Sequence, residues 1–306
     1  MQSPMRSLRQ SDGFILIVVI WVAALLALVA AAFVRSAQSH VRATAISIQT
    51  MRAELLADSV LSLVALDLIS RRLDASKRRF PVDGTPVRCS FDGGRVVVVL
   101  QDAGGRVNLN TANDELLRAL FVGLGASKAQ ASSYADAIID FRDRDDLRRP
   151  SGAEKPEYLA AGRPLGPKNA AFDNLDELHQ VLGLDPDIIA AMIPYVTIHS
   201  GTAGLDLEVI SPVLSDLLAR GAGGPSGLSS AVIGERVLPT EFIVSSTRRV
   251  FLAKITARTA SATTFVRETV IELPQARIGL PIYRVWKRGF EPDSFDDETD
   301  FLPPPC

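Results

Sequence analysis

The residues most able to do chemistry lie in an acidic loop near the middle of the chain. Asp140, Asp143 and Asp145 fall within six residues, and Glu154 follows. Carboxylate oxygens are the ligands that Ca²⁺ prefers, and the ion takes about six to eight of them. Arg148 stands where an EF-hand requires glycine, so the loop does not match that motif. The chemistry indicates a candidate calcium site, and a solvated loop of Asp–Arg pairs is the alternative.

Other reactive side chains are scarce in the 306 residues. Two cysteines and three histidines exclude a disulfide-rich scaffold and disfavour a zinc site. The sequence lacks the HExxH, Walker A and GxSxG patterns, which disfavours an enzyme of a familiar kind. A net charge of −2 creates no global field that would hold nucleic acid. Cys89 is predicted to be a buried free thiol in a strand, with a disulfide to Cys306 as the alternative.

An uncharged apolar stretch, residues 14–34, lies near the N-terminus and is long enough to cross a bilayer as a helix. Arg6 and Arg9 precede it, so the positive-inside rule keeps the N-terminus cytoplasmic and sends the bulk of the chain outward. Neither Gly nor Pro interrupts residues 14–80, and helical composition continues without a break. This continuity favours a retained helix over a cleaved secretory signal, which is the alternative.

The helix is expected to continue as an amphipathic segment that packs on a folded head. The face expected to pack carries Ile48, Met51, Leu55, Leu56, Ser59, Leu63 and Leu66. A β-hairpin is predicted over residues 87–101. Further β-rich segments are predicted to complete an antiparallel sheet on the long helix, at residues 240–247, 250–257, 264–273 and 283–286.

Residues 102–220 are predicted to form an all-helical insertion between the strands. Thr111 is expected to cap a first helix, and residues 128–141 form the second helix of a helix–hairpin–helix. Residues 204–214 echo residues 106–116, which indicates two weakly repeated units. Helix–hairpin–helix units also occur in DNA-binding modules. Here the Arg and Asp charges around the acidic loop roughly cancel, so the loop does not form the basic surface that would hold phosphates. DNA binding is therefore the alternative and not the favoured function.

Several of these segments together resemble a known family. A basic leader ending in Gly13, with Phe14 and an apolar helix after it, is similar to a type IV prepilin leader. The chain then reads DxGGxxNLNTA from residue 102, DFRDRDD from residue 140 and GAExxxY from residue 152. LDELxxVLG and PYVTIHSG follow at residues 175 and 194. This series resembles the minor pseudopilin K family of type II secretion systems.

The resemblance implies an α+β fold. A long N-terminal transmembrane and amphipathic helix packs on an antiparallel pilin-like sheet, and a large all-α insertion of the helix–hairpin–helix or SAM-like type interrupts the sheet. The implied divisions are a prepilin leader (1–13), a transmembrane helix (14–34), the rest of the helix with the first strands (35–101), the insertion (102–220), the remaining strands (221–290) and a flexible acidic tail (291–306).

The resemblance also implies a role and a set of ligands. The family's members are non-enzymatic minor pseudopilins at the tip of the pseudopilus, where they initiate or cap assembly for export of folded proteins across the outer membrane. Prepilin peptidase would cut between Gly13 and Phe14 and methylate the new N-terminus. Val18 stands at the fifth mature position, where most pilins carry Glu. Calcium would be held by Asp140, Asp143, Asp145 and Glu154.

The implied location is the inner membrane, crossed once, with the N-terminus cytoplasmic and the bulk in the periplasm. The implied partners are the other minor pseudopilins, the major pseudopilin, prepilin peptidase, the membrane and secreted protein substrates, without nucleic acid. The alternative function is a membrane-anchored helix–hairpin–helix DNA-binding protein of an uptake system.

Overall fold

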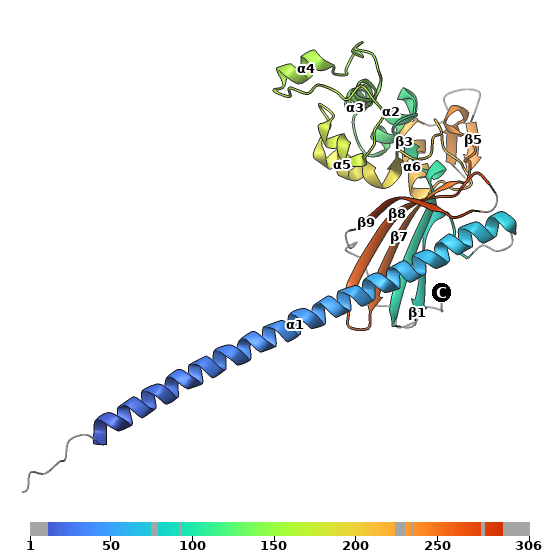
Figure 1. The fold of residues 1–306 in the computed structure, drawn as a ribbon. Helices are drawn as coiled ribbons and strands as arrows, with labels where there is room; N and C mark the ends of the chain where they lie inside the picture. The colour runs from blue at the N-terminus through green and yellow to red at the C-terminus, as the bar shows by residue number, and fades with distance from the viewer. Residues whose placement is uncertain are drawn as a thin grey trace, which may run out of the picture.

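The structure is a computed structural model that describes residues 12–74, 79–91, 93–223, 230–233, 236–276 and 279–289. Three parts follow one another in space (Figure 1). A long helix extends from one end, a sheet packs on the second half of that helix, and a mainly helical insertion sits at the far end of the sheet. The predicted leader, apart from Asp12 and Gly13, and the predicted acidic tail lie outside the described residues.

The long helix, α1 (Asp12–Leu73), has 62 residues and is about 93 Å long at the usual rise per residue. It forms because Ala, Leu and other helix formers run through it without a Gly or Pro after Gly13. Its N-terminal half stands clear of the head (Figure 1), and Phe14 is 71% exposed. Among the described residues, this one helix is long and apolar enough to cross a membrane.

Five antiparallel strands form the sheet in the order β1-β2-β7-β8-β9. They are β1 (Asp83–Phe91), β2 (Gly94–Asp102), β7 (Val250–Thr259), β8 (Thr264–Glu272) and β9 (Ile282–Arg288). The predicted hairpin and three of the later β segments are confirmed. The fourth, residues 240–247, is not a strand. It begins with the 3₁₀ turn η4 (Thr240–Phe242), and its backbone pairs with the insertion at Leu205 instead.

The sheet buries one face of α1. That face carries Ala53, Leu56, Ala57, Val60, Leu61, Val64 and Leu68, which pack with alternate residues of the strands such as Val98 and Ile255. The predicted packing face was wrong for most positions, since Met51, Leu55 and Leu66 are each about 60% exposed. Because α1 is apolar on several sides, periodicity alone does not select the buried side.

A buried cation fixes α1 on the sheet. Arg267 of β8 is 5% exposed and donates to Asp58 Oδ1 at 2.8 Å and to Glu54 Oε1 at 2.7 Å. Its guanidinium lies 4.6 Å from the centre of the Trp286 ring and 4.9 Å from that of Phe265. Charge-assisted hydrogen bonds are directional, so this contact sets the rotation and the register of α1.

Cys89 of β1 is buried and takes part in a disulfide. The prediction of a free thiol was therefore wrong. The prediction rested on the burial expected of a cysteine in a strand, whereas a disulfide depends on which distant part of the chain reaches that cysteine. Cys306, the only other cysteine in the sequence, lies outside the described residues.

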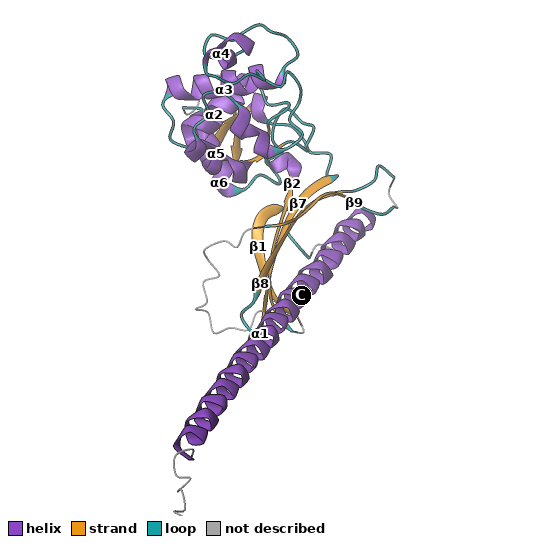
Figure 2. Cartoon of the chain, turned by 60° about the vertical axis from the view of Figure 1, so that its left-hand side comes forward, coloured by secondary structure: helices purple, strands orange, loops and turns teal. Residues whose placement is uncertain are grey.

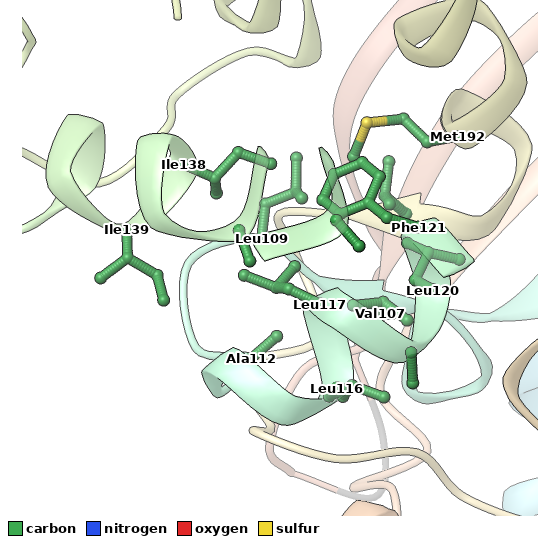
Figure 3. Packing of buried hydrophobic residues seen from close by; sticks show 14 of the residues in the cluster. Val107, Leu109, Ala112, Leu116, Leu117, Leu120, Phe121, Ile138, Ile139 and Met192 are labelled. Carbon is green, nitrogen blue, oxygen red and sulfur yellow. The ribbon is translucent and has the colours of Figure 1, made fainter. Parts of the chain in front are cut away.

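The insertion enters between β2 and β7, which are neighbours in the sheet. Its helices are α2 (Asp114–Gly123), α3 (Lys128–Arg142), α4 (Lys155–Ala160), α5 (Pro186–Met192) and α6 (Pro212–Gly221). The insertion also contains the 3₁₀ turns η1 (Ala103–Gly105), η2 (Leu175–Gln180) and η3 (Ile193–Tyr195). Figure 3 shows the core between α2 and α3, with Leu117, Phe121 and Ile138 pointing inward and Met192 of α5 beside them.

The insertion is not purely helical, contrary to the prediction. β3 (Val107–Asn108) pairs in parallel with β4 (Val196–Thr197), and β5 (Ser230–Ile233) pairs with β6 (Arg236–Pro239). Leu238 and Phe242 belong to the same core as the helices, so the insertion's core extends beyond residue 220. The pairing of β3 with β4 joins segments that are far apart in the chain, and strands of two residues are too short to show a pattern in the sequence.

The predicted internal repeat is real in structure. Asn108 Oδ1 accepts from the Asn110 amide at 2.8 Å, and Asp206 Oδ1 accepts from the Glu208 amide at 2.9 Å. Each turn precedes a helix, capped by Asn113 for α2 and by Ser211 for α6. Thr111, the predicted cap, instead donates to the Thr202 carbonyl. Asp replaces Asn in the second turn without loss because either side chain accepts this bond.

The two repeated helices contact each other closely at equivalent glycines. A β-carbon at Gly123 would overlap the Leu217 carbonyl, and one at Gly221 would overlap the Ala119 carbonyl. Gly is therefore required at both positions by the distance between the α2 and α6 backbones.

We predict that Gly221→Ala lowers the free energy of unfolding by about 1–3 kcal/mol, because overpacking forces the helices apart. Chemical denaturation of the full chain in detergent measures the loss. Arg220→Ala, an exposed change on the same turn, is the control and should alter stability little. Equal stability of the two variants would contradict the close approach.

Candidate functional site

The acidic site is built where α3 ends and α4 begins. Asp136 and Asp140 lie on the last turns of α3, and Glu154 immediately precedes α4. Asp140 is fully buried and Glu154 is 2% exposed. Charged residues are seldom buried to this degree unless paired, so the arrangement calls for a compensating interaction.

Two of the carboxylates hold the loop between the helices. The Arg149 amide donates to Asp140 Oδ2 at 3.1 Å, and the Ser151 amide donates to Asp136 Oδ2 at 3.0 Å. Gly152 follows, and its backbone lies so close that a β-carbon would overlap the Asp140 carboxylate. The loop therefore folds back over the end of α3 and brings Glu154 toward Asp140.

Several buried oxygens in this region lack hydrogen-bond partners. They are both carboxylate oxygens of Glu154, Oδ1 of Asp143 and Oδ1 of Asn169. A buried oxygen without a partner costs about 1–3 kcal/mol, and more when it is charged. Carboxylate and amide oxygens of this kind are the ligands that a hard cation such as Ca²⁺ takes.

The carboxyl groups repel one another in the absence of a cation. Burial raises the pKa of Glu154 to about 7, and the charges of Asp140 and Asp143 add to the effect. Burial likewise raises the pKa of Asp140 to about 6, with Asp143 contributing. The pKa of Asp143 is raised by burial and by Asp145. A bound cation would favour the charged forms and reverse these shifts.

The predicted ligands are not equivalent. Asp140, Asp143 and Glu154 lie together, whereas Asp145 is exposed and its Oδ1 accepts from the Leu147 amide at 2.9 Å. In the described part of the chain, no three Asp, Glu, His or Cys side chains are spaced as a ready-made metal cluster. The calcium site therefore stays a prediction, supported by the unpaired oxygens.

Sequence reasoning missed Asn169 and Asp146 at this site. Asn169 adopts a positive φ of 48°, and its Nδ2 donates to Asp146 Oδ1 at 3.0 Å and to the Asp145 carbonyl at 3.3 Å. Its Oδ1 is buried without a hydrogen-bond partner, so it could act as a neutral ligand if a cation binds here. Asn tolerates the left-handed conformation, but a single Asn beyond the acidic segment carries no signal on its own.

The predicted processing site lies at the start of α1. Gly13 and Phe14 are both in the helix, which begins at Asp12. Cleavage between them is not tested by the fold and stays a prediction.

Comparison with known proteins finds similarity to one family, and the matched residues include the acidic site. Residues 97–201, which contain the acidic site, match the family model for type II secretion system protein K. Type II secretion protein K of Pectobacterium carotovorum is 27% identical over 207 residues, covering 60% of this chain and 62% of that protein. The Pseudomonas aeruginosa protein K is 26% identical over 250 residues, covering 73% of each chain.

A solved structure agrees in fold. The crystal structure of the GspK–GspI–GspJ complex from enterotoxigenic Escherichia coli matches with a TM-score of 0.55 and 18% identity, covering 82% of this chain and all of that chain. Over residues 97–201, and in relatives that are 26–27% identical, this chain is similar to type II secretion system protein K. The chain spans less than two thirds of the length of the Pectobacterium member, so the activity of that whole protein is carried over only as a proposal.

The similarity to protein K includes the acidic site. All four predicted ligands lie inside the matched range, within the insertion rather than in the sheet and α1. The site therefore belongs to the insertion, which lies between β2 and β7 in the chain.

The raised pKa values predict how stability depends on pH. Without metal, Asp140 and Glu154 bind more protons when folded than when unfolded between about pH 4 and pH 7. The melting temperature in EGTA should therefore fall as the pH rises through this window. Added Ca²⁺ should abolish this fall in melting temperature, because the ion stabilises the ionised carboxylates of the folded protein. Identical profiles with EGTA and with Ca²⁺ would contradict a calcium site.

Gly152→Ala tests the same site sterically. The added methyl group must displace the Asp140 carboxylate, so we expect at least tenfold weaker Ca²⁺ binding, about 1.4 kcal/mol. Asp143→Ala should weaken binding similarly, whereas Asp187→Ala, an exposed acid on α5, is the control. Isothermal titration of the full chain in detergent measures the affinities.

Proposed function

We propose that this chain is the minor pseudopilin that caps the tip of a type II secretion pseudopilus and initiates its assembly for protein export. The observation that carries the proposal is the position of the insertion. It sits beyond the end of the sheet, remote from the bare half of α1 (Figure 2). A filament stacks its subunits along their N-terminal helices, so a large unit at the opposite end obstructs addition of another subunit there.

A second feature supports association with other pseudopilins. Ile48, Met51, Leu55, Leu66 and Leu73 are exposed apolar residues of α1. At 3.6 residues per turn they lie within about 60° of one another, on the side of α1 that does not pack on the sheet. Exposed apolar stripes of this kind mark interaction sites. We infer that this stripe packs against the helices of neighbouring subunits.

The partners inferred for this stripe are other minor pseudopilins. The solved relative is a complex with GspI and GspJ, which supports equivalent partners here. The major pseudopilin would follow below them, and prepilin peptidase would process the leader. Secreted proteins are further candidate partners at the exposed tip.

Val18 supports the tip position on energetic grounds. With cleavage between Gly13 and Phe14 it is the fifth mature residue, and it carries no charge. A carboxylate within a bilayer is costly unless paired, and the usual Glu pairs with a neighbouring N-terminus. A subunit with no neighbour above it loses nothing by lacking this group.

The inferred location is the inner membrane, with the N-terminus in the cytoplasm and the head in the periplasm. The exposed apolar half of α1 and the leader arginines support this orientation. The disulfide of Cys89 supports it independently, because disulfides persist in the oxidising periplasm and are rare in the cytosol.

We further propose that Ca²⁺ is the ion held by Asp140, Asp143, Asp145 and Glu154, with Asn169 as an added ligand. The ion would neutralise the buried carboxylates and join α3 to the start of α4. Its role is structural, because it would fix the loop within the insertion.

The DNA-binding alternative finds less support. In helix–hairpin–helix modules, the hairpin amides hold phosphate. Here the Ser127 amide donates to Gln130 Oε1 at 3.1 Å, and the Gln130 amide donates to Ser127 Oγ at 3.3 Å. This capping box already engages two of the amides at the start of α3.

We predict that the mature protein begins with a methylated Phe14. Mass spectrometry of protein extracted from membranes checks the N-terminus, and Gly13→Leu, which removes the small residue before the cut, should block processing. A mature N-terminus near Ala32 would instead indicate a cleaved secretory signal and contradict the proposal.

Photo-crosslinking tests the position in the filament. A photoreactive residue at Leu66, on the exposed stripe, should crosslink to other minor pseudopilins. One at Leu165, which is 93% exposed on the insertion, should give no crosslink to filament subunits. Crosslinks from both positions to the major pseudopilin would place the protein within the shaft and overturn the tip assignment.

A further inference from the structure

The helix α1 carries a basic stripe between its apolar stretch and the sheet. The stripe consists of Arg35, Gln38 and Arg42, which are spaced i, i+3 and i+7, so they lie on one side of the helix, and all three are exposed. Neither Asp nor Glu occurs in residues 13–53. The ion pairs described for α1 involve Glu54 and residues beyond it, so neither arginine is neutralised within the described part of the chain.

The basic stripe continues the side of α1 that packs on the sheet. Eighteen residues make five helical turns, so Arg35 lies in line with Ala53, and Arg42 lies in line with Val60. Ala53 and Val60 are fully buried against the sheet. The side of α1 that is apolar under the sheet is therefore basic where the sheet no longer covers it.

The head leaves this part of α1 open (Figure 1). Residues 14–48 are all exposed, and the first hydrogen bond described between α1 and the head is the one that Gln49 Oε1 accepts from Ser261 Oγ at 2.8 Å. Gln49 lies about 21 Å along the helix axis from Arg35. The headgroup layer on each side of a bilayer is about 5–8 Å thick. A headgroup layer therefore fits around the basic stripe without contact with the head.

The stripe has the depth of headgroup phosphates if residues 14–34 cross the bilayer. The apolar stretch ends at Val34, so Arg35 lies at the boundary between hydrocarbon and headgroups. Arg42 lies about 10 Å further along the axis, and helical side chains lean toward the N-terminus, which directs its guanidinium back toward the membrane. A guanidinium binds phosphate through two parallel hydrogen bonds. Both arginines can thus reach the same layer of phosphates.

The position of the stripe favours lipid over the helix of a neighbouring subunit. The exposed apolar stripe of α1, with Ile48, Met51 and Leu55, lies roughly 130° round the helix from the basic stripe. Helices that pack on the apolar stripe therefore leave the basic stripe facing away from them. An acidic side chain of a partner's head is the alternative occupant.

We propose that Arg35, Gln38 and Arg42 bind the phosphate groups of anionic phospholipids in the leaflet nearer the head, and that these contacts set the depth of α1 in the bilayer. The inference rests on the membrane location proposed above. Anionic headgroups supply the negative charge that residues 13–53 lack. Attraction to an anionic surface strengthens binding about fivefold per arginine.

Photoreactive lipids test this contact on the full chain reconstituted in vesicles. The vesicles contain phosphatidylcholine with a minority of phosphatidylglycerol, and either lipid carries a photoreactive group in its acyl chain. Relative to its share of the bilayer, phosphatidylglycerol should crosslink more than phosphatidylcholine. Arg35→Gln and Arg42→Gln should each lower this preference about fivefold, and the double variant should abolish it.

Arg52→Gln is the matched control. Arg52 is an exposed arginine of the same helix, about 25 Å beyond Arg35, so its loss should leave the preference unchanged. Higher salt should weaken the preference of the wild-type chain, because screening weakens the attraction between charges. Equal crosslinking of the two lipids to the wild-type chain, or an unchanged preference in the double variant, would overturn the inference.

Two further outcomes separate this contact from the membrane location on which it rests. Extraction of the wild-type chain from the vesicles by alkaline carbonate would overturn the membrane location and the lipid contact together. Retention in the vesicles without a preference for phosphatidylglycerol would overturn the lipid contact alone. If the double variant keeps the lipid preference but no longer co-purifies with other minor pseudopilins, the arginines bind acids of a partner protein and the inference is wrong.

Discussion

The structure depends on one constraint, which is that α1 is far longer and more apolar than its own sheet can cover. The sheet buries α1 only between Ala53 and Leu68, and Phe14 to Val34 remain exposed in the isolated chain. Apolar surface of this extent is stable only in contact with lipid or with other apolar helices. This part of α1 therefore requires an apolar environment, which a bilayer or neighbouring apolar helices would supply.

A hydrogen-bond network joins the sheet to the insertion. Asp102 at the end of β2 accepts from Ser246 Oγ at 2.5 Å, and the Ser246 amide donates to Asp206 Oδ2 at 2.8 Å. Arg248 donates to the same Asp206 oxygen at 3.0 Å. Burial raises the pKa of Asp102, while the bond from Ser246 opposes the rise. This network ties the second repeated turn to the sheet, so the insertion is held at both its entry and its exit.

The insertion and the sheet are stabilised by different means. The sheet packs on α1 through a continuous apolar core and the buried Arg267. The insertion has its own core, but it also carries the long segment between α3 and α5, where little regular structure occurs. Asp143 Oδ1 and both carboxylate oxygens of Glu154 are buried in this segment without hydrogen-bond partners, and a bound cation would remove this cost. A structural ion would therefore stabilise the segment between α3 and α5, where few backbone hydrogen bonds hold the chain.

The sequence by itself determined the elements whose signals are local. The unbroken apolar run predicted α1, the turn residues before Gly94 predicted the β1–β2 hairpin, and the repeated turns at Asn108 and Asp206 were visible as an echo. The acidic loop was also visible, because its carboxylates are close together in the chain. The order of these motifs was enough to indicate the family.

Only the tertiary structure decided the features that join distant segments. It selected the side of α1 that packs, since Ala53 and Ala57 let the sheet approach where Met51 and Leu55 do not. It added β5 and β6 to the insertion, brought Asn169 to the acidic site, and placed Cys89 in a disulfide. The physical reason is the same in each case: these contacts depend on which surfaces meet after folding, and no local spacing of residues encodes that meeting.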